Sequence, residues 1–228
     1  MRIYAIGDLH LSHANPKPMG VFGAAWNQHW EKICANWWRL ITAEDVVLIP
    51  GDISWAMKLS DAVTDLNSIA ELPGKKIIMR GNHDYWWNSL AKVSSVLPAS
   101  MIALQNDCVD LGEVVVCGSR GWLCKGSSGF KEEDEKIYNR ELVRLELSLS
   151  KAAGKNIIAM THYPPFNERQ EESGFSLLYQ KYSVSTAIYG HLHGRSCEYA
   201  FEGALNGTQY NLVSCDHLDF CPKLIWQC

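Results

Sequence analysis

Acidic and histidine side chains recur in this sequence directly after short apolar runs. In chain order these residues are Asp8 and His10, Asp52, Asn82 and His83, His162, and His191 and His193. A single residue of this kind after a strand is usually part of a turn or a hydrogen-bonded core residue. Repetition at five strand ends predicts instead that the side chains converge, because ligands of open α/β sheets bind at the carboxyl ends of strands.

Such a group of side chains has a clear chemical use. Five imidazoles and two carboxylates packed together would be costly to bury without counter-ions, and divalent cations offset that cost. Mixed nitrogen and oxygen ligands favour Mn, Fe, Zn or Co over Ca or Mg alone. The ligands are too many for one ion, so two divalent or trivalent transition-metal ions about 3.5–4 Å apart, sharing one carboxylate, fit the count.

Two pairs in the series have the same spacing. Asp8 and His10 are two residues apart, and so are His191 and His193. In an extended chain, residues at this spacing point to the same side, so both members of a pair could reach one ion.

The elements that must position these residues alternate along the chain. The apolar runs expected as strands are Ile3–Ile6, Val46–Ile49, Lys76–Met79, Val114–Cys117, Asn156–Met160 and Thr186–Tyr189. Their continuous apolar character is typical of strands covered on both faces. Helical patterns are expected over Trp26–Ile41, from Ser60 or Asp61 to Glu71, and over Glu132–Ala153. This alternation predicts the α/β class.

The sequence after His193 lacks helical periodicity. Cys197–Phe201, Gln209–Val213 and Lys223–Trp226 are therefore expected to be strands of an antiparallel meander.

Composition narrows the possible partners. The chain has 228 residues, of which 47% are hydrophobic, which suits one globular domain with a large core. A formal charge of -4 without a long basic run argues against nucleic acid as a partner. The sequence has no apolar run of about 18 residues, so no membrane association is expected.

The N-terminus is expected to be a strand rather than a signal peptide, which favours a cytoplasmic location. The eight cysteines, none of them in a C-x-x-C pair, are then expected to be reduced and mostly buried.

The ordered series resembles the calcineurin-like metallophosphoesterase superfamily. Its five motifs are Asp8-x-His10, Gly51-Asp52, Gly81-Asn82-His83-Asp84, Thr161-His162 and Gly190-His191-x-His193. The resemblance implies a four-layer αββα sandwich, with two mixed β-sheets flanked by helices, in a single domain covering residues 1–228.

The resemblance also implies a role for each matching residue. One metal ion would be held by Asp8, His10, Asp52 and His193. The other would be held by Asp52, Asn82, His162 and His191. Asp52 would bridge the two ions, and a metal-bridging hydroxide would attack phosphorus in line. His83 would face the phosphate and assist the departing oxygen as the catalytic acid.

The expected activity is hydrolysis of a small phosphoester. A phosphomonoesterase and a phosphodiesterase acting on a nucleotide-type ester both fit the sequence, which leaves the physiological substrate and the oligomeric state open. The alternatives are a non-catalytic relative that binds only metal or a partner, and a purely structural metal site.

The second motif departs from one branch of the family. Gly51-Asp52 continues as Ile53-Ser54-Trp55-Ala56, without the later Asp-Arg-Gly of the protein Ser/Thr phosphatases. The phosphate-clamping arginine and the histidine-orienting aspartate of that branch are missing, which argues for the predicted phosphohydrolase branch instead. Asp84 is expected to cap a following helix rather than to orient His83.

Several residues are candidates for substrate contact. Arg80 matches an arginine before Gly-Asn-His in that branch, with a structural salt bridge as the alternative. Residues 119–153 are expected to form a lid, from which Arg120 and Arg140 could meet phosphate oxygens, and surface solubility is the alternative. His13 could reach the edge of the site, although an exposed loop position is favoured.

Three tryptophans follow ligand motifs. Trp55, Trp86 and Trp87 are expected either to line the substrate pocket or, more commonly for tryptophan, to pack in the core.

Overall fold

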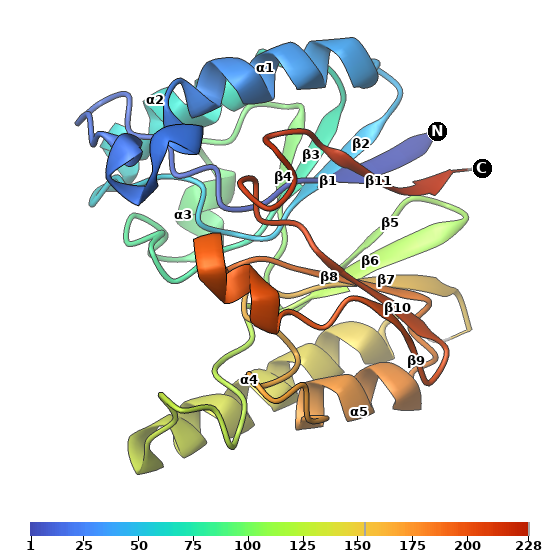
Figure 1. Cartoon of the computed structure of the whole chain (residues 1–228). Helices are drawn as coiled ribbons and strands as arrows, with labels where there is room; N and C mark the ends of the chain where they lie inside the picture. Colours follow the sequence, from blue (N-terminus) through green and yellow to red (C-terminus); the bar gives the residue numbers. More distant parts are fainter. Residues whose placement is uncertain (153, 228) are drawn as a thin grey trace. The chain divides into compact units, whose positions relative to one another are not determined.

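The computed structural model describes residues 1–152 and 154–227, and it contains two compact units. Unit 1 comprises Met1–Ala103 and Val213–Cys228, and unit 2 comprises Leu104–Leu212. Each unit is built around one mixed β-sheet, and helices flank both sheets (Figure 1). The expected α/β class, with two mixed sheets flanked by helices, is confirmed.

Unit 1 has a five-stranded sheet. Its strands are β1 (Arg2–Ala5), β2 (Val46–Ile49), β3 (Lys75–Ile78), β4 (Met101–Ala103) and β11 (Lys223–Gln227). Its helices are η1 (Met19–Phe22), η2 (Ala24–Trp26), α1 (His29–Leu40), α2 (Leu59–Ala70) and α3 (Leu90–Ser94). The strand order is β11-β1-β2-β3-β4, with β1 to β4 parallel and β11 antiparallel to β1. The carboxyl ends of four strands therefore meet at one edge.

The buried core of unit 1 is formed by alternate residues of its strands together with residues of its helices. Tyr4 and Val47 belong to one buried cluster together with Trp37 of α1 and Leu66 of α2. The residues that alternate with Tyr4 on β1 and with Val47 on β2 are buried as well, so these strands are covered on both faces. This explains why their sequences are continuously apolar instead of alternating with polar residues.

Unit 2 has a six-stranded sheet. Its strands are β5 (Cys108–Asp110), β6 (Val114–Gly118), β7 (Asn156–Met160), β8 (Thr186–Tyr189), β9 (Gly203–Leu205) and β10 (Thr208–Leu212). Its helices are α4 (Glu132–Ser150), α5 (Gly174–Lys181) and η3 (Gly194–Tyr199). The strand order is β5-β6-β7-β8-β10-β9, in which β6, β7, β8 and β10 are parallel. Helices α4 and α5 pack against each other and share one buried cluster with the sheet (Figure 1).

All six strands predicted from apolar runs are present, within one residue at each end. The predicted antiparallel meander is wrong, because β10 pairs in parallel with β8, and β11 pairs with β1 in unit 1. The predicted strand Cys197–Phe201 is also wrong: most of it lies in or next to η3, which begins after His193. The hydroxyl of Ser196 bonds both the amide and the carbonyl of His193 and so favours this turn over a strand.

The three predicted helices are present with shifted ends. Helix α1 begins at His29, because η2 and a left-handed Gln28 (φ 55°) precede it. Lys58, rather than Ser60 or Asp61, is the N-cap residue of α2. Helix α4 ends at Ser150, and the predicted end at residue 153 lies outside the described residues.

Within the described residues, no helix is both long enough and apolar enough to cross a membrane. Seven cysteines are free thiols, whereas Cys228 lies outside the described residues. Burial raises the pKa of Cys34 to about 11 and that of Cys117 to about 12, so both thiols are neutral at ordinary pH.

Candidate metal centre

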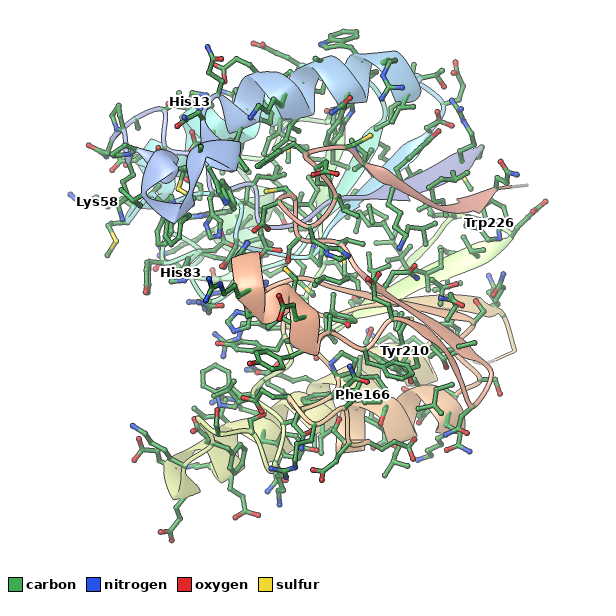
Figure 2. The ribbon with its side chains drawn as sticks, viewed as in Figure 1. His13, Lys58, His83, Phe166, Tyr210 and Trp226 are labelled. Carbon is green, nitrogen blue, oxygen red and sulfur yellow. The ribbon has the colours of Figure 1, made fainter. Side chains whose placement is uncertain are left out.

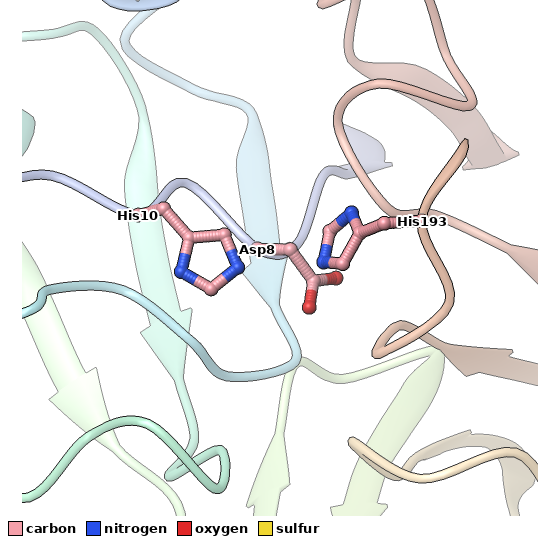
Figure 3. Close-up of side chains that lie close together, drawn as sticks. All are labelled: Asp8, His10 and His193. Carbon is pink, nitrogen blue, oxygen red and sulfur yellow. The ribbon is translucent and has the colours of Figure 1, made fainter. Parts of the chain in front are cut away.

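The loop after β1 carries the first two predicted ligands. Asp8 and His10 are both buried, and a carboxylate oxygen of Asp8 lies within 4.8 Å of a ring nitrogen of His10. Their amides donate hydrogen bonds of 3.0 and 2.9 Å to the carbonyls of Gly51 and Asp52, which ties this loop to the loop after β2. Figure 3 shows the Asp8 carboxylate and the His10 ring.

The pairing of Asp8 with His10 does not arise as the sequence predicts. Asp8 has φ 57° and His10 has φ 48°, so the chain is left-handed at both residues rather than extended. The two side chains come together because the backbone turns at both residues, not because an i, i+2 pair shares one side of an extended strand.

Asp52 lies at the centre of unit 1's ligands. Its carboxylate is buried, lies within 4.8 Å of that of Asp8, and has Oδ2 3.8 Å from Nε2 of His10. Two buried carboxylates this close would repel each other if both are ionised, and a cation between them removes that repulsion. Oxygen and imidazole donors are what Mn, Fe, Zn and Co accept, so this group of side chains fits such an ion.

The third motif approaches Asp52 from β3. The amide of His83 donates a 2.8 Å hydrogen bond to Oδ1 of Asp52. A Cβ at Gly81 would lie 2.1 Å from that same oxygen and 2.3 Å from the Asp52 amide nitrogen. Gly81 is therefore required for the close approach of the loop after β3 to the loop after β2. Asn82 is half-buried and lies in sequence between Gly81 and His83, which both contact Asp52.

Aromatic packing fixes the ring of His83. Its centroid lies 4.5 Å from Trp55, 5.8 Å from His10 and 6.1 Å from Tyr85. Trp55 also stacks on His10, at 4.8 Å and an interplanar angle of 20°. Trp55 thus packs against two predicted functional histidines at once, and both rings have little freedom to rotate.

The other two tryptophans belong to the core. Trp86 and Trp87 are fully buried in the unit 1 cluster and contact each other at 5.3 Å. Both therefore pack in the core, which is the commoner of the two roles considered for them.

Asp84 joins the loops instead of capping a helix. Its buried carboxylate accepts hydrogen bonds from the amides of Ile53, Ser54 and Gly81, at 2.9, 3.1 and 2.7 Å. It also accepts one of 3.0 Å from the indole of Trp86. The expected helix cap is wrong, because the next helix begins only at Leu90 and is capped by Ser89.

In unit 2, His162 and His191 lie close to each other. His162 follows β7 and is fully buried, and its ring centroid is 5.1 Å from that of His191 after β8. The amide of His162 donates to the carbonyl of Arg120, and the amide of Gly190 donates to the carbonyl of His162. These bonds fix the backbone on both sides of the pair.

The ring of His191 also packs on Tyr163, at 4.3 Å between centroids. His193 follows two residues later, half-buried, at the start of η3.

Four of the seven predicted ligands have left-handed backbones. His191 has φ 75° and Asp52 has φ 50°, in addition to Asp8 and His10. Each such residue costs about 1–3 kcal/mol and persists only where the surrounding structure enforces it. Strain of this kind clusters at functional sites. Among the described residues, four of the eleven non-glycine residues with positive φ are predicted ligands.

The three predicted substrate-binding arginines have different surroundings. Arg80 is half-buried, and its buried Nε has no hydrogen-bond partner among the described residues. The Arg120 guanidinium lies 4.7 Å from the ring centroid of Trp122. Arg140 is on α4, half-exposed, with its Nε 3.9 Å from Glu141.

The sequence did not indicate the partner of His13. Nδ1 of His13 lies 2.6 Å from Oδ1 of Asp65, a buried carboxylate on α2, and Oδ2 of Asp65 accepts a hydrogen bond from Ser54. The His13 side chain is therefore held by a carboxylate in a half-exposed position. Asp65 stands at an ordinary place in an amphipathic helix, so only its burial in the structure singles it out.

Comparisons with known proteins indicate the family of the chain. The calcineurin-like phosphoesterase family profile matches residues 1–195. A protein named probable cyclic nucleotide phosphodiesterase, from Vesicomyosocius okutanii, is 24% identical over 159 residues. That match covers 65% of this chain and 62% of the relative, so it spans less than two thirds of the relative's length.

Solved structures share the fold. A phosphopantetheinyl hydrolase from Mycobacterium tuberculosis has a TM-score of 0.61 at 13% identity, covering 100% of this chain and 96% of its own. A protein of unknown function from Aquifex aeolicus has a TM-score of 0.54 at 16% identity, covering 98% of this chain and 95% of its own. Because the family profile extends over all five motifs and most of the sequence, the chain belongs to the calcineurin-like phosphoesterase family.

Proposed function

We propose that the protein is a dinuclear metal-dependent phosphoester hydrolase. The observation that carries this proposal is the buried group formed by Asp8, His10 and Asp52, which offers two carboxylates and an imidazole at the carboxyl ends of adjacent parallel strands. One ion would be held by Asp8, His10, Asp52 and His193. The second would be held by Asp52, Asn82, His162 and His191, so that Asp52 bridges the two.

The metals would be two ions chosen from Mn, Fe, Zn and Co, as the mixture of imidazole and oxygen donors favours. When bound, they would lower the pKa of a water molecule and neutralise the phosphoryl oxygens. The rest of the chemistry belongs to side chains of this chain.

His83 is the proposed catalytic acid. Its ring is packed by Trp55 and Tyr85, and its backbone is bonded to Asp52, so the imidazole is fixed next to the proposed bridging carboxylate. A protonated imidazole held there can donate its proton to the ester oxygen as the bond to phosphorus breaks.

Arg80 is the arginine best placed to meet the phosphoryl group. Its buried Nε lacks a partner among the described residues, and a buried guanidinium donor of this kind is satisfied by a phosphate oxygen. Arg120 and Arg140 stay in the proposal as weaker candidates, together with a lid over residues 119–153. The contacts of the two side chains with Trp122 and Glu141 would have to rearrange for them to reach a phosphate.

The proposed substrate is a small phosphomonoester or a nucleotide-type phosphodiester. The name of the relative from Vesicomyosocius okutanii supports the diester. The free thiols of the described cysteines support the cytoplasmic location expected from the sequence.

The test is an assay of the purified full chain after loading with Mn. We expect hydrolysis of p-nitrophenyl phosphate or bis(p-nitrophenyl) phosphate that stops when a chelator removes the metal, with about two metal ions bound per chain. Changing Asp52 to Ala should remove both ions. Bound metal without chelator-sensitive turnover of either ester would favour the alternative, a relative that only binds metal or a partner.

A further inference from the structure

A cavity lies within unit 2 beside one of the proposed ligands. Its volume is about 280 Å³, and it is lined by residues of three segments, 123–128, 164–168 and 191–201. His191 is among the lining residues, so the cavity reaches the predicted metal ligand directly. We call it the 166 pocket, after Phe166.

Aromatic rings form one wall of the 166 pocket. Phe166 and Phe201 have centroids 4.6 Å apart, and Tyr199 lines the pocket at a more exposed position. Phe166 is supported from behind by Tyr210, at 4.9 Å and an interplanar angle of 71° (Figure 2). This wall is aromatic and is supported by a further ring, which suits contact with a ring of a ligand.

Most polar groups that line the pocket are already engaged within the protein. The Ser196 hydroxyl donates to the carbonyl of His193 and accepts from its amide. The Asn167 amide donates to Glu171, and its oxygen accepts from the amides of Arg169 and Glu171. These side chains have few donors or acceptors left to hydrogen-bond a polar ligand. The pocket therefore suits an apolar ligand better than its polar lining residues would indicate.

Cys124 behaves in the same way. Its thiol donates to the carbonyl of Pro164, and burial raises its pKa to about 12, so it stays neutral.

The pocket has a negative charge and no positive one among its described lining residues. Glu168 is exposed at its edge and accepts hydrogen bonds from the amide and the hydroxyl of Ser128. Burial alone would raise its pKa, but these hydrogen bonds outweigh that effect and lower the pKa, so the carboxylate is ionised at neutral pH. A phosphate or carboxylate group would be repelled here, whereas an uncharged group that donates hydrogen bonds would be accepted.

From these observations we propose that the 166 pocket binds a flat, uncharged ring on the alcohol part of the phosphoester substrate. The inference rests on the proposed function, because it uses His191 as a metal ligand to place the phosphoryl group next to the pocket. The volume is just below the range of about 300–1,000 Å³ that holds drug-sized ligands, so a group of one or two rings fits. Phe166 and Phe201 contact one face of the ring, and Glu168 selects against anionic alcohols.

The first experiment compares two primary alkyl esters with similar leaving groups, 2-(2-naphthyl)ethyl phosphate and ethyl phosphate. With the Mn-loaded protein, we expect kcat/KM to be at least about tenfold higher for the naphthyl ester. Ser127→Trp fills the pocket and should abolish that preference, because it should lower kcat/KM for the naphthyl ester about tenfold more than for ethyl phosphate. An unchanged preference, or an equal loss for both esters, would overturn the proposal.

The second experiment tests the charge at the edge, with a variant that leaves the interior intact. Glu168→Lys should raise kcat/KM for 2-carboxyethyl phosphate by about fivefold. Glu198→Lys is the matched control, because Glu198 is an exposed residue of η3 that does not line the pocket. Equal effects of the two substitutions would show that the charge acts at long range and not in the pocket.

A binding measurement separates this proposal from the proposed function. Equilibrium dialysis of the metal-free protein against 2-(2-naphthyl)ethanol should show saturable binding that Ser127→Trp abolishes and Glu198→Lys retains. If no ester is hydrolysed but this pattern is found, the proposed function fails and the ring pocket stands. If wild type does not bind the alcohol, the pocket proposal is wrong whatever the activity.

Discussion

The backbone amide of His83 donates a 2.8 Å hydrogen bond to Oδ1 of Asp52. The contact between His83 and Asp52 therefore uses the main chain of His83, and the imidazole takes no part in this hydrogen bond. Any residue other than proline at position 83 keeps this amide N–H. Loss of the imidazole and loss of the metal centre can thus be separated by mutation.

His83→Ala should lower kcat by about 10²–10⁴-fold while metal content stays near that of wild type, because only the proton donor is lost. The loss should be larger for alkyl phosphates than for p-nitrophenyl phosphate, whose leaving group needs no proton. Metal analysis and kcat for both esters check this, with His217→Ala as the control histidine. Metal loss in His83→Ala would show that the ring itself supports the centre.

Gly81→Ala should damage the centre without changing any ligand. The new Cβ would lie 2.1 Å from Oδ1 of Asp52, so one of the two loops must shift. We expect the free energy of unfolding to fall by about 1–3 kcal/mol, together with loss of bound metal. Urea unfolding and metal analysis measure the two effects.

The control for this substitution is Gly129→Ala. A Cβ at Gly129 would meet its nearest neighbour, Leu123, only at 3.9 Å, an ordinary contact. Comparable losses in both variants would mean that alanine at a glycine, rather than the clash with Asp52, causes the effect.

Much of this site could be predicted from sequence because its signals are local. A continuous apolar run marks a strand such as Val46–Ile49, and the residue type that follows it marks a ligand such as Asp52. Both kinds of information lie within a few residues of each other. The parallel order of the strands then brings these ends to one edge of the sheet.

What the sequence could not show depends on distant contacts. Asp84 was expected to cap a helix, but it bonds the amides of Ile53 and Ser54, about thirty residues away. The hold of Asp65 on His13 is of the same kind. Strands of three residues, such as β4 and β9, carry too little apolar pattern to stand out from loops.

Asp84→Asn should destabilise the protein although it is nearly isosteric. Both carboxylate oxygens of Asp84 accept hydrogen bonds from N–H groups. In asparagine an NH2 group replaces one of these oxygens, so at least one N–H group would point at another donor. Leaving buried donors without an acceptor costs about 1–3 kcal/mol. Because the same carboxylate holds the loops of Asp52 and His83 together, kcat should fall as well.

Asp107→Asn is the matched control for Asp84→Asn. Asp107 forms a surface ion pair with Lys151 in which both side chains are about half exposed. Such pairs contribute about 0–1 kcal/mol. Chemical unfolding of both variants gives the comparison, and an equal cost would contradict the role assigned to Asp84.

The last prediction concerns acid stability and rests on Asp45, which joins the starts of β1 and β2. Burial alone would raise the pKa of Asp45, but hydrogen bonds from Arg2 and Thr42 outweigh it and lower the pKa from 3.8 to about 2. A carboxyl with a depressed pKa stabilises the fold above its unfolded value, and this contribution is lost as the pH falls through the folded value. The free energy of unfolding should therefore lose about 2 kcal/mol between pH 4 and pH 2 through this group. In Asp45→Asn this loss of unfolding free energy between pH 4 and pH 2 should disappear. In Asp107→Asn most of the loss should remain. Unfolding curves of wild type and Asp45→Asn that stay parallel over this range would show that Asp45 is not responsible.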